Sequence, residues 1–580
     1  MKRTGPVIIQ DAAKQATDDQ DKSIKPEQTV AQVKEKMKAM DLKILDQTMR
    51  IDNGRLDIPV FFSTCGHDAK AVIGTQKQMG KGATPTQAEA SAIMELVERF
   101  SFFSFYQNPA HTRLATCAQI GDQAIAFEQI ARSVHDDSED LAVARKLFDT
   151  LPLRWTGAFN LTREREVLVP IDWFYAINAF NGPSAGNCVA EALCQGICEV
   201  VERHVSSIVS RERLAVPVIN PNSSADRLVR EMLGKYNRAG IKVVLSDFTL
   251  EMGIPTVGVL AYDPETFPQR SEIVWTAGTT PSPEKALSRA LSEVAQLAGD
   301  FNTGSNYVAS GLPKFSSLKE ADYVIGAPGP IALSTLPDIS NDNIRIEVES
   351  CVQALAERDF EVITVDTMHP ELAIPAFYTI IPGAHFRERA AGTSVAMFVA
   401  KLTVQQFPVD QAIGRLLDMD RQLPGKYFVQ FYLGNCHLEL GDPEQALTHF
   451  SRAIDLSPHA QDAASIYSYM GVCHKDLGNY QAALEVLAKG EALDAERTDI
   501  YNLMGFCHFM RKEHEAAIKC FEQVIKLDPS SAIDYANIAS NCRDMGKTDE
   551  AIRYYRLALE LDPSIDFARD NLERLSGQAN

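Results

Sequence analysis

The carboxy-terminal part of the chain repeats small residues at a spacing that few folds can satisfy. Four of them recur at intervals of 37, 34 and 34 residues, at Gly434, Gly471, Gly505 and Ala539. Each is followed twelve residues later by an alanine, at Ala446, Ala483, Ala517 and Ala551. A proline stands further on at Pro458, Pro529 and Pro563. Small residues let two antiparallel helices approach and proline ends the second helix, so the spacing predicts a stack of helix pairs.

This period resembles the tetratricopeptide repeat, which implies an all-α solenoid of about four repeats over residues 425–575. The match departs from the ideal where Ala495 replaces the proline and where three extra residues separate the first two units. Three cysteines at equivalent repeat positions, Cys436, Cys473 and Cys507, are expected to pack between helices. Such arrays usually present a groove to a peptide or a partner protein. The alternative is an array that only braces its own chain or dimerises it.

Nearer the amino terminus, one segment occurs twice and ends both times in the pattern E-x-V-E-R. The first copy runs from Gly82 to Glu95, Glu98 and Arg99, and the second from Gly186 to Glu199, Glu202 and Arg203. In both copies the glycine stands thirteen residues before the first glutamate. Positions three apart on a helix share one face, so each copy would present two carboxylates beside a guanidinium.

The four glutamates need a partner for their charge. Two neighbouring carboxylates repel each other unless a cation lies between them, and hard oxygen ligands suit magnesium or calcium. The alternative is a pair of solvated surface helices, where glutamate and arginine at this spacing are mildly stabilising. Small and apolar residues flank the charges, such as Ala88, Ala92, Ala192 and Ile197, and they predict buried helices with paired glutamates. A magnesium ion with a nucleotide is the interpretation we favour.

Composition excludes several other classes of function. The chain of 580 residues has 45% hydrophobic and 23% charged residues, an ordinary globular balance with room for about three or four domains. Its formal net charge of −20 argues against a nucleic-acid surface, and no Lys/Arg-rich run occurs. The amino terminus lacks the apolar region of a signal peptide, and no stretch of about eighteen apolar residues is present to span a membrane. We therefore expect a cytoplasmic protein.

The cysteines and the common catalytic motifs narrow the chemistry further. Eleven cysteines without regular paired spacing fit reduced thiols, and we expect Cys188, Cys194 and Cys198 to pack in the core rather than bind a metal. The patterns H-E-x-x-H and G-x-S-x-G and the G-x-x-x-x-G-K-[ST] phosphate loop are missing from the sequence. Residues 80–82 instead predict a turn leading to Thr84. This threonine would cap a helix with Pro85 in its first position and Gln87 completing a capping box.

Between residue 1 and the repeats, strand-like and helix-like stretches alternate, which predicts an α+β or α/β domain. We expect strands over residues 58–63, 167–173, 242–246, 256–262, 272–277, 361–365 and 376–381. A further helix follows Ser282 and Pro283, and its apolar positions form one stripe. Arg289, Glu293 and Gln296 share another face of that helix. They form either a surface pair or part of one polar cavity with the E-x-V-E-R helices, and the second interpretation explains more of the charges.

Taken together, the motifs resemble the YcaO family over residues 20–400. The matching residues are Gly80-Lys81-Gly82 with the pattern A-x-x-S-A-x-x-E-x-x-E-R (88–99), Ser184-Ala185-Gly186-Asn187 with Glu191, Glu199, Glu202 and Arg203, and R-A-x-x-E-x-x-Q (289–296). Three ordered motifs with matching internal spacing make a chance match a poor explanation. The resemblance implies an α+β YcaO-type ATP-binding domain that works without a phosphate loop.

The resemblance also implies roles for individual residues, with ATP and Mg²⁺ as cofactors. Glu95, Glu98, Glu199 and Glu202 would hold magnesium ions that bridge the phosphates. The residues lining the nucleotide pocket would be Asn187, Glu191, Arg203, Arg289 and Glu293. The pattern P-E-x-T at residues 26–29 nominates Thr29 and Lys22 as phosphate contacts, and Lys25 competes with Lys22 for that role. No residue resembles a covalent nucleophile, so no catalytic residue is assigned.

In YcaO enzymes a nucleophile adds to the carbonyl of a peptide substrate and ATP phosphorylates the resulting oxyanion. Loss of phosphate then leaves an azoline, a thioamide or an amidine. The residues after Pro382, His385-Phe386-Arg387-Glu388-Arg389, differ from the proline-rich tail of many azoline-forming members. The resemblance therefore implies an ATP- and Mg²⁺-dependent enzyme of the cyclodehydration or thioamidation class, with its substrate or a partner docked by the repeats.

Two other functions remain open from the sequence. One is an accessory or scaffold protein that supports a partner modification enzyme, as in β-methylthiolation of a ribosomal protein. The other is a different ATP-dependent ligase or kinase, which would need a fixed acceptor group. For the organisation, we expect an amino-terminal segment (1–19), the YcaO-like domain (20–400), a linker (401–424) and the repeats (425–575). The expected partners are a peptide or protein, without nucleic acid or membrane, and a homodimer is a further alternative.

Overall fold

The computed structural model describes residues 6–15, 21–52, 54–74, 77–268, 270–298, 301, 315, 317–326, 329–386, 393–528 and 530–578. Two compact units make up the chain, and each is formed by two stretches of sequence. The first, which we call the mixed unit, consists of Met1–Asp136 with Asp149–Arg389. The second, the repeat unit, consists of Asp137–Phe148 with Ala390–Asn580.

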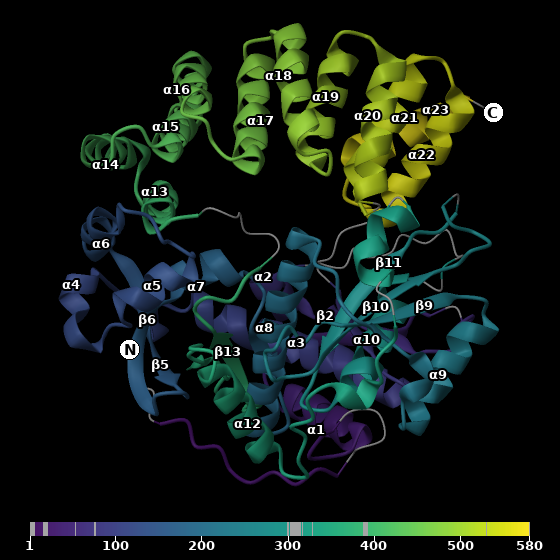
Figure 1. Cartoon of the computed structure of the whole chain (residues 1–580). Helices are drawn as coiled ribbons and strands as arrows, with labels where there is room; N and C mark the ends of the chain where they lie inside the picture. Colours follow the sequence, from purple (N-terminus) through teal and green to yellow (C-terminus); the bar gives the residue numbers. More distant parts are fainter. Residues whose placement is uncertain are drawn as a thin grey trace. The chain divides into compact units, whose positions relative to one another are not determined.

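Among the described residues of the mixed unit, three antiparallel sheets form the framework (Figure 1). Their strands are β1 (Leu45–Arg50), β2 (Val60–Cys65), β3 (Gln78–Lys81), β4 (Arg113–Ala115), β5 (Leu153–Asn160), β6 (Arg165–Pro170), β7 (Pro183–Ala185), β8 (Val218–Ile219), β9 (Lys242–Asp247), β10 (Thr256–Tyr262), β11 (Val274–Thr279), β12 (Ile363–Asp366) and β13 (Ala376–Ile380). The strand orders are β1-β2-β3, β11-β10-β9-β8 and β4-β5-β12-β13-β7, and β6 pairs with β5 in the last sheet.

Helices cover these sheets and form the core with them. They are α1 (Pro26–Ala39), α2 (His67–Ile73), α3 (Pro85–Gln107), α4 (Cys117–Ile120), α5 (Phe127–Ser133), α7 (Ile171–Asn178), α8 (Val189–Glu212), α9 (Arg227–Arg238), α10 (Pro283–Ala298), α11 (Asp322–Ile325) and α12 (Ile344–Ala356). Helix α3 packs against β2 and β3, α8 against β7 and β13, and α10 against β10 and β11. The two E-x-V-E-R segments are therefore the buried helices α3 and α8, as the flanking alanines predict.

Glycines let the chain pass very close to these two helices. A methyl group on Gly80 of β3 would lie 2.1 Å from the backbone nitrogen of Ala92 and 2.2 Å from the carbonyl oxygen of Ala88. A methyl group on Gly186 would lie 2.5 Å from the backbone nitrogen of Ala192. Only glycine permits such backbone contact, so both glycines fix the segment that leads into its helix.

Two details of the sequence prediction are wrong. The strand expected over 167–173 ends at Pro170, and α7 begins at Ile171. Asp172 lies in the first turn of α7, where a carboxylate is favoured, and accepts hydrogen bonds from Arg154. Short apolar runs do not distinguish strand from helix, which explains the error. Gly80 and Lys81, expected in a turn, belong to strand β3, and the turn follows them.

The repeat unit consists of helices. Four pairs follow the predicted period: α15 (Tyr427–Glu439) with α16 (Pro443–Asp455), α17 (Ala460–Asp476) with α18 (Tyr480–Leu493), α19 (Thr498–Met510) with α20 (His514–Leu527), and α21 (Ala532–Asp544) with α22 (Thr548–Leu561). The remaining helices are α6 (Leu141–Asp149), α13 (Val395–Gln406), α14 (Val409–Gln422) and α23 (Asp566–Gln578). Helix α14 thus occupies most of the stretch expected as a linker.

The small residues of the period mark contacts between paired helices. A methyl group on Gly434 would lie 2.5 Å from the ring of Phe450, and one on Gly471 would lie 2.5 Å from the side chain of Leu487. The four alanines of the period and the three cysteines at equivalent positions are all fully buried. Pro529 lies outside the described residues. None of the described helices in either unit is both long enough and apolar enough to cross a membrane.

Candidate functional site

Helix α3 begins with two of the three local signals that its sequence predicts, the threonine cap and the proline but not the capping box. Thr84 accepts a hydrogen bond from the backbone nitrogen of Gln87, and Pro85 occupies the first position. From this fixed start, Glu95, Glu98 and Arg99 follow on one side of the helix. The guanidinium of Arg99 lies 3.5 Å from Glu98 and 3.9 Å from Glu95, measured between nitrogen and oxygen. Helix α3 therefore presents two carboxylates with an arginine between them.

Helix α8 places its charges differently. Glu199 faces the carboxylates of α3 and raises the pKa of both Glu95 and Glu98 through its charge. Glu202 is buried, accepts a hydrogen bond from the backbone nitrogen of Thr279 at 3.1 Å and lies 3.6 Å from Arg289. The second glutamate of this copy therefore supports an arginine of α10.

Helix α10 contributes the third side of the site. Its apolar stripe is buried, as predicted, with Ala286, Leu287, Ala290, Leu291 and Val294 fully inaccessible. Arg289, Glu293 and Gln296 lie on the opposite side and line one cavity with the residues of α3 and α8. Arg289 donates a hydrogen bond from Nη1 to Oε1 of Gln195 at 2.9 Å. Glu293 pairs with Lys81 of strand β3.

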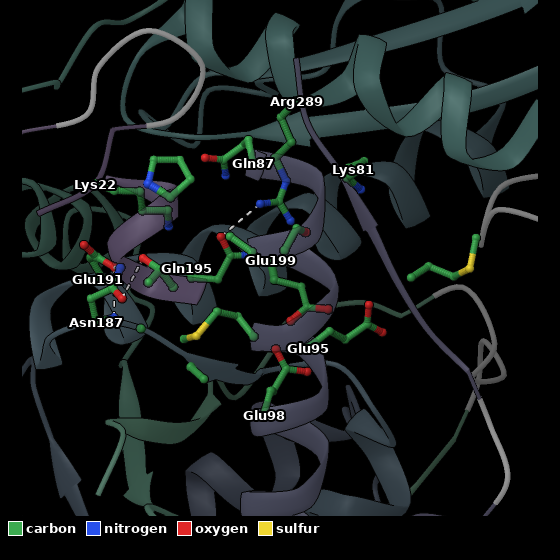
Figure 2. Close-up of a pocket in the computed structure, with 18 of the residues that line it drawn as sticks. Lys22, Lys81, Gln87, Glu95, Glu98, Asn187, Glu191, Gln195, Glu199 and Arg289 are labelled. Atoms are coloured by element: carbon green, nitrogen blue, oxygen red, sulfur yellow. Dashed lines mark hydrogen bonds between the residues drawn. The ribbon is translucent and has the colours of Figure 1, made fainter. Parts of the chain in front are cut away.

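The cavity between these helices has a volume of about 240 Å³. Figure 2 shows Glu95, Glu98 and Glu199 gathered at one part of it, and Asn187, Glu191 and Lys22 at another, with Arg289 reaching in between. Five cationic side chains line the same space, namely Lys22, Lys81, Arg99, Arg203 and Arg289. Five carboxylates line it as well, namely Glu95, Glu98, Glu191, Glu199 and Glu293, so the cavity brings acidic and basic side chains together in equal number.

Burial and repulsion shape the charge of the carboxylates. Burial raises the pKa of Glu98 well above its ordinary value, and the charges of Glu199 and Glu95 raise it further against the opposing effect of Arg99. Burial also raises the pKa of Glu95. Burial alone would raise the pKa of Glu293, but Lys81, Arg203 and Arg289 bring it below the ordinary value. Glu293 is thus a stable anion, whereas Glu95 and Glu98 lack a sufficient positive partner.

The amino-terminal segment closes the other end of the cavity. Thr29 is buried and donates a hydrogen bond from Oγ1 to Oδ1 of Asn187 at 3.0 Å. Asn187 in turn donates from its backbone and its side chain to Oε2 of Glu191, at 3.0 Å and 2.9 Å. The other oxygen of Glu191 accepts two hydrogen bonds from Ser23. Lys22 lines the cavity, whereas Lys25 is exposed and precedes α1, so the geometry favours Lys22 over Lys25.

The donor set fits a nucleotide with a divalent cation by its chemistry. Hard carboxylate oxygens suit magnesium, and a cation among Glu95, Glu98 and Glu199 would offset the repulsion that raises their pKa values. The surrounding lysines and arginines suit a chain of phosphates. Within the described residues, no three His, Cys, Asp or Glu side chains converge as a ready-made metal site. The three glutamates therefore share the cavity without meeting at one point, and Glu202 lies outside its lining.

A comparison with known protein families identifies both parts of the chain. The family model described as YcaO cyclodehydratase, ATP- and Mg²⁺-binding, matches residues 79–385, which is more than half of the chain. The chain belongs to the YcaO family. The tetratricopeptide repeat model matches residues 428–496 and 496–564 of the repeat unit. Both parts of the predicted fold class are thus confirmed.

Relatives and solved structures agree with this assignment. An uncharacterised protein of Methanothermobacter thermautotrophicus is 25% identical over 383 residues, covering 62% of this chain and 94% of that protein. The ribosomal protein S12 methylthiotransferase accessory factor YcaO of Escherichia coli is 26% identical over 247 residues, covering 38% and 40%. A solved heterocyclase in complex with substrate and cofactor shares the fold with a TM-score of 0.53, at 20% identity, covering 66% of this chain and 55% of that chain. The chain thus spans about half the length of these last two proteins.

The sequence analysis assigns no individual role to several residues that hold the side chains of this cavity. Ser23 holds Glu191, Gln195 accepts from Arg289, and Lys81 pairs with Glu293. These contacts join residues 94 to 212 positions apart, so no local periodicity reveals them. Two of them carry a sequence signal: Lys81 stands in the Gly80-Lys81-Gly82 motif, and Gln195 follows Glu191 by four residues on the same helix.

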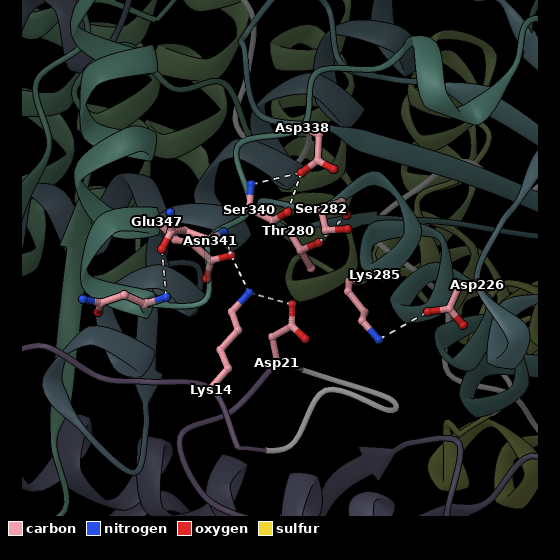
Figure 3. Close-up of polar contacts among 11 residues, drawn as sticks. Lys14, Asp21, Asp226, Thr280, Ser282, Lys285, Asp338, Ser340, Asn341 and Glu347 are labelled. Carbon is pink, nitrogen blue, oxygen red and sulfur yellow. Dashed lines mark hydrogen bonds and ion pairs between the residues drawn. The ribbon is translucent and has the colours of Figure 1, made fainter.

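A second, smaller cavity of about 60 Å³ adjoins the first in the mixed unit. Lys22, Glu191, Gln195 and Arg289 line both cavities, so the two share a wall. Figure 3 shows Lys14 between Asp21 and Glu347 beside this space, and its Nζ lies 2.8 Å from Asp21 and 2.7 Å from Glu347. These ion pairs tie the amino-terminal segment to the start of α12.

Proposed function

We propose that the chain is an ATP- and Mg²⁺-dependent enzyme that activates a backbone amide of a peptide or protein substrate. The observation that carries the proposal is the cavity in which Glu95, Glu98 and Glu199 gather at one part of a space that five cationic side chains also line. A site for ordinary structural ion pairs would balance its charges locally. Here Glu95 and Glu98 keep raised pKa values although Arg99 lies beside them, which favours an additional cation.

The proposed roles follow the positions of the side chains. Glu95, Glu98 and Glu199 would hold magnesium, and Glu202 would support Arg289 from behind. The nucleotide would lie against Lys22, Thr29, Asn187, Glu191, Arg203, Arg289 and Glu293. Bound ATP would supply the phosphoryl group that turns an amide oxygen into a leaving group.

The protein's own residues would position and shield the reactants. Lys81 pairs with Glu293, and Arg203 also lowers the pKa of that carboxylate, so we propose that Glu293 orients both cations in the cavity. The contacts of Glu191 with Ser23 and Asn187 fix the amino-terminal segment over the nucleotide end of the cavity. We propose that this segment excludes water from the site.

We further propose that the repeat unit docks the substrate or a partner protein. Helices α17, α19 and α21 and the end of α20 line a cavity of about 530 Å³ in that unit, with Tyr469, Asn502 and Leu503 among its residues. The cavity offers both amide and apolar contacts, which is what an extended peptide needs.

An accessory role is the second candidate, because one relative is named as an accessory factor of a methylthiotransferase. Phosphate release by the purified chain separates the two. Steady release that Glu199→Gln abolishes would favour an enzyme. Nucleotide binding without any release, under the same conditions, would favour an accessory protein.

The first experiment is calorimetric titration of ATP into the full chain with and without magnesium, alongside Glu199→Gln. We expect magnesium-dependent binding that the variant loses while its circular dichroism stays unchanged. Glu89→Gln is a matched control, because Glu89 lies on α3 but pairs with Lys34 and Thr48 away from the cavity. Absence of binding in the native chain would contradict the proposal.

A further inference from the structure

Three thiols gather where α8 packs against α12. Cys194 and Cys198 lie one turn apart on α8, and Cys351 lies on α12. Each of the three thiols perturbs the pKa of the other two, so the three side chains lie close together. Cys194 and Cys198 both line the second cavity, but Cys194 is half-buried, whereas Cys198 and Cys351 are buried. Core packing, the sequence prediction for Cys194 and Cys198, therefore describes Cys198 better than Cys194.

The position of Cys194 links this cluster to the nucleotide cavity. Its neighbour Gln195 accepts the hydrogen bond of Arg289, and Glu191, one turn earlier, holds Asn187 and Ser23. Any change in the backbone of α8 at Cys194 therefore acts on residues that line both cavities. A small reagent that enters the second cavity meets this thiol.

The surroundings of Cys194 favour its reactive form. Hydrogen bonds from Cys198 and Cys351 lower the pKa of the Cys194 thiol well below its ordinary value, and the charges of Lys22 and Lys14 act in the same direction. The pKa values of Cys198 and Cys351 are raised instead. The thiolate is the nucleophilic form of cysteine, and Cys194 is the half-buried member of the cluster at the wall of the second cavity, so it is the thiol placed to react.

We propose that Cys194 and Cys351 form a peroxide-sensitive pair whose disulfide joins α8 to α12 and lowers the affinity of the chain for nucleotide. In the first step the Cys194 thiolate attacks hydrogen peroxide, the O–O bond breaks, and a sulfenic acid and hydroxide form. In the second step the Cys351 sulfur attacks the sulfenic sulfur. The S–S bond forms, the S–O bond breaks, and the released hydroxide leaves as water with the thiol proton.

Cys351 is the resolving thiol on geometric grounds. Residues four apart on a helix have Cβ atoms about 5–6 Å apart. A disulfide needs Cβ atoms about 3.5–4.5 Å apart, so Cys194 and Cys198 cannot join without unwinding α8. Cys351 approaches from another helix and is free of that restriction. The disulfide therefore crosses between α8 and α12.

The test uses the full chain, reduced, freed of reductant and then exposed to hydrogen peroxide. Free thiols are blocked with N-ethylmaleimide, and tryptic peptides are analysed by mass spectrometry without reduction. We expect the peptide of residues 346–358, which contains Cys351, to be linked to the peptide of residues 166–203. Dithiothreitol should reverse the link. The link should disappear in Cys194→Ser and persist in Cys198→Ser, and Cys117→Ser, distant in sequence and half-buried, is the matched control.

A second readout is the affinity for the ATP analogue AMPPCP with magnesium, before and after peroxide. We expect oxidation to weaken binding by about fivefold or more in the native chain and to leave Cys351→Ser unchanged. This readout rests on the proposed nucleotide site, whereas the disulfide does not. If the reduced chain binds no analogue, the proposed function fails before peroxide is added. A peptide 346–358 that keeps a free thiol, a link that survives Cys194→Ser, or a disulfide without loss of affinity would overturn the inference.

Discussion

Helices α3 and α8 carry the same E-x-V-E-R pattern and use it differently. On α3 both glutamates line the cavity and Arg99 lies between them. Of the two glutamates in the α8 pattern, Glu199 lines the cavity, while Glu202 accepts a hydrogen bond from the backbone of Thr279 and faces Arg289. A repeated pattern fixes the spacing of charges along a helix. The neighbouring elements then decide which charges meet a ligand and which support another side chain.

The neighbours of the two helices explain the difference. Helix α3 packs against β2 and β3 and leaves its charged side to the cavity, whereas α8 also packs against β11, whose end at Thr279 reaches Glu202. Arg289 of α10 enters from the same direction. The second glutamate of α8 is therefore enclosed by protein, and the second glutamate of α3 is not.

The strongest test of this difference is the affinity for magnesium and AMPPCP. Glu98→Gln should weaken binding by about 100-fold, because a carboxylate next to a divalent cation contributes about 2.7 kcal/mol. Glu202→Gln should weaken it by less, because its effect passes through Arg289. Isothermal titration of both variants, with Glu89→Gln as the control, measures the ratio. Equal losses in the two variants would mean that α3 and α8 play equivalent roles.

Stability should show the opposite order. Glu202→Gln should lower the free energy of unfolding by about 2 kcal/mol, because half-buried Arg289 loses an acidic partner. Glu98→Gln should leave stability unchanged or raise it, since it removes repulsion from Glu95 and Glu199. Urea denaturation without nucleotide measures both. A Glu98→Gln variant less stable than Glu202→Gln would contradict this division of roles.

The pH dependence of stability should separate Glu98 from its neutral variant. The folded chain keeps the proton of Glu98 above the ordinary pKa of glutamate, so it binds more protons than the unfolded chain there. The contribution of Glu98 to the free energy of unfolding is therefore greatest below about pH 4.5, and it decreases as the pH rises toward the raised pKa of Glu98. We therefore subtract the free energy of unfolding of Glu98→Gln from that of the native chain. This difference should decrease as the pH rises over that interval. A difference that does not vary with pH would show that Glu98 titrates normally.

The smallest expected effect concerns the hydrogen bond that joins Thr29, in the first turn of α1, to Asn187, which precedes α8. Thr29→Val removes the hydrogen bond to Asn187 and should weaken nucleotide binding by about fivefold, or about 1 kcal/mol. Thr48→Val, which removes a bond to Glu89 outside the cavity, is the matched control. Equal affinities for the native chain and Thr29→Val would exclude this contact from the site.

The sequence predicts those features that depend on spacing along one element. The period of glycines and alanines predicts the helix pairs, and the stripe from Ala286 to Leu297 predicts which side of α10 is buried. Thr29, Asn187, Arg289 and Glu293 all line one cavity, as the resemblance implies. The roles given to these residues remain predictions.

Other features depend on which elements meet, and spacing does not contain that information. Glu202 is buried because the end of β11 packs over it, where the backbone of Thr279 donates to its carboxylate. The hydrogen bond from Ser23 to Glu191 joins residues 168 positions apart. The sequence prediction also omits β5, a central strand that pairs with β4, β6 and β12. Its residues mix glycine and polar side chains with apolar ones, so they lack the alternation that marks a strand.

The contacts of Lys22, Ser23 and Thr29 have a practical meaning for recombinant fragments. The family match begins at residue 79, and a fragment cut there would keep every glutamate and arginine of the three cavity helices. It would nevertheless lack Lys22, the serine that holds Glu191 and the threonine that holds Asn187. Such a fragment would lack part of the wall of the cavity. Its inactivity would therefore not show that the intact chain is inactive.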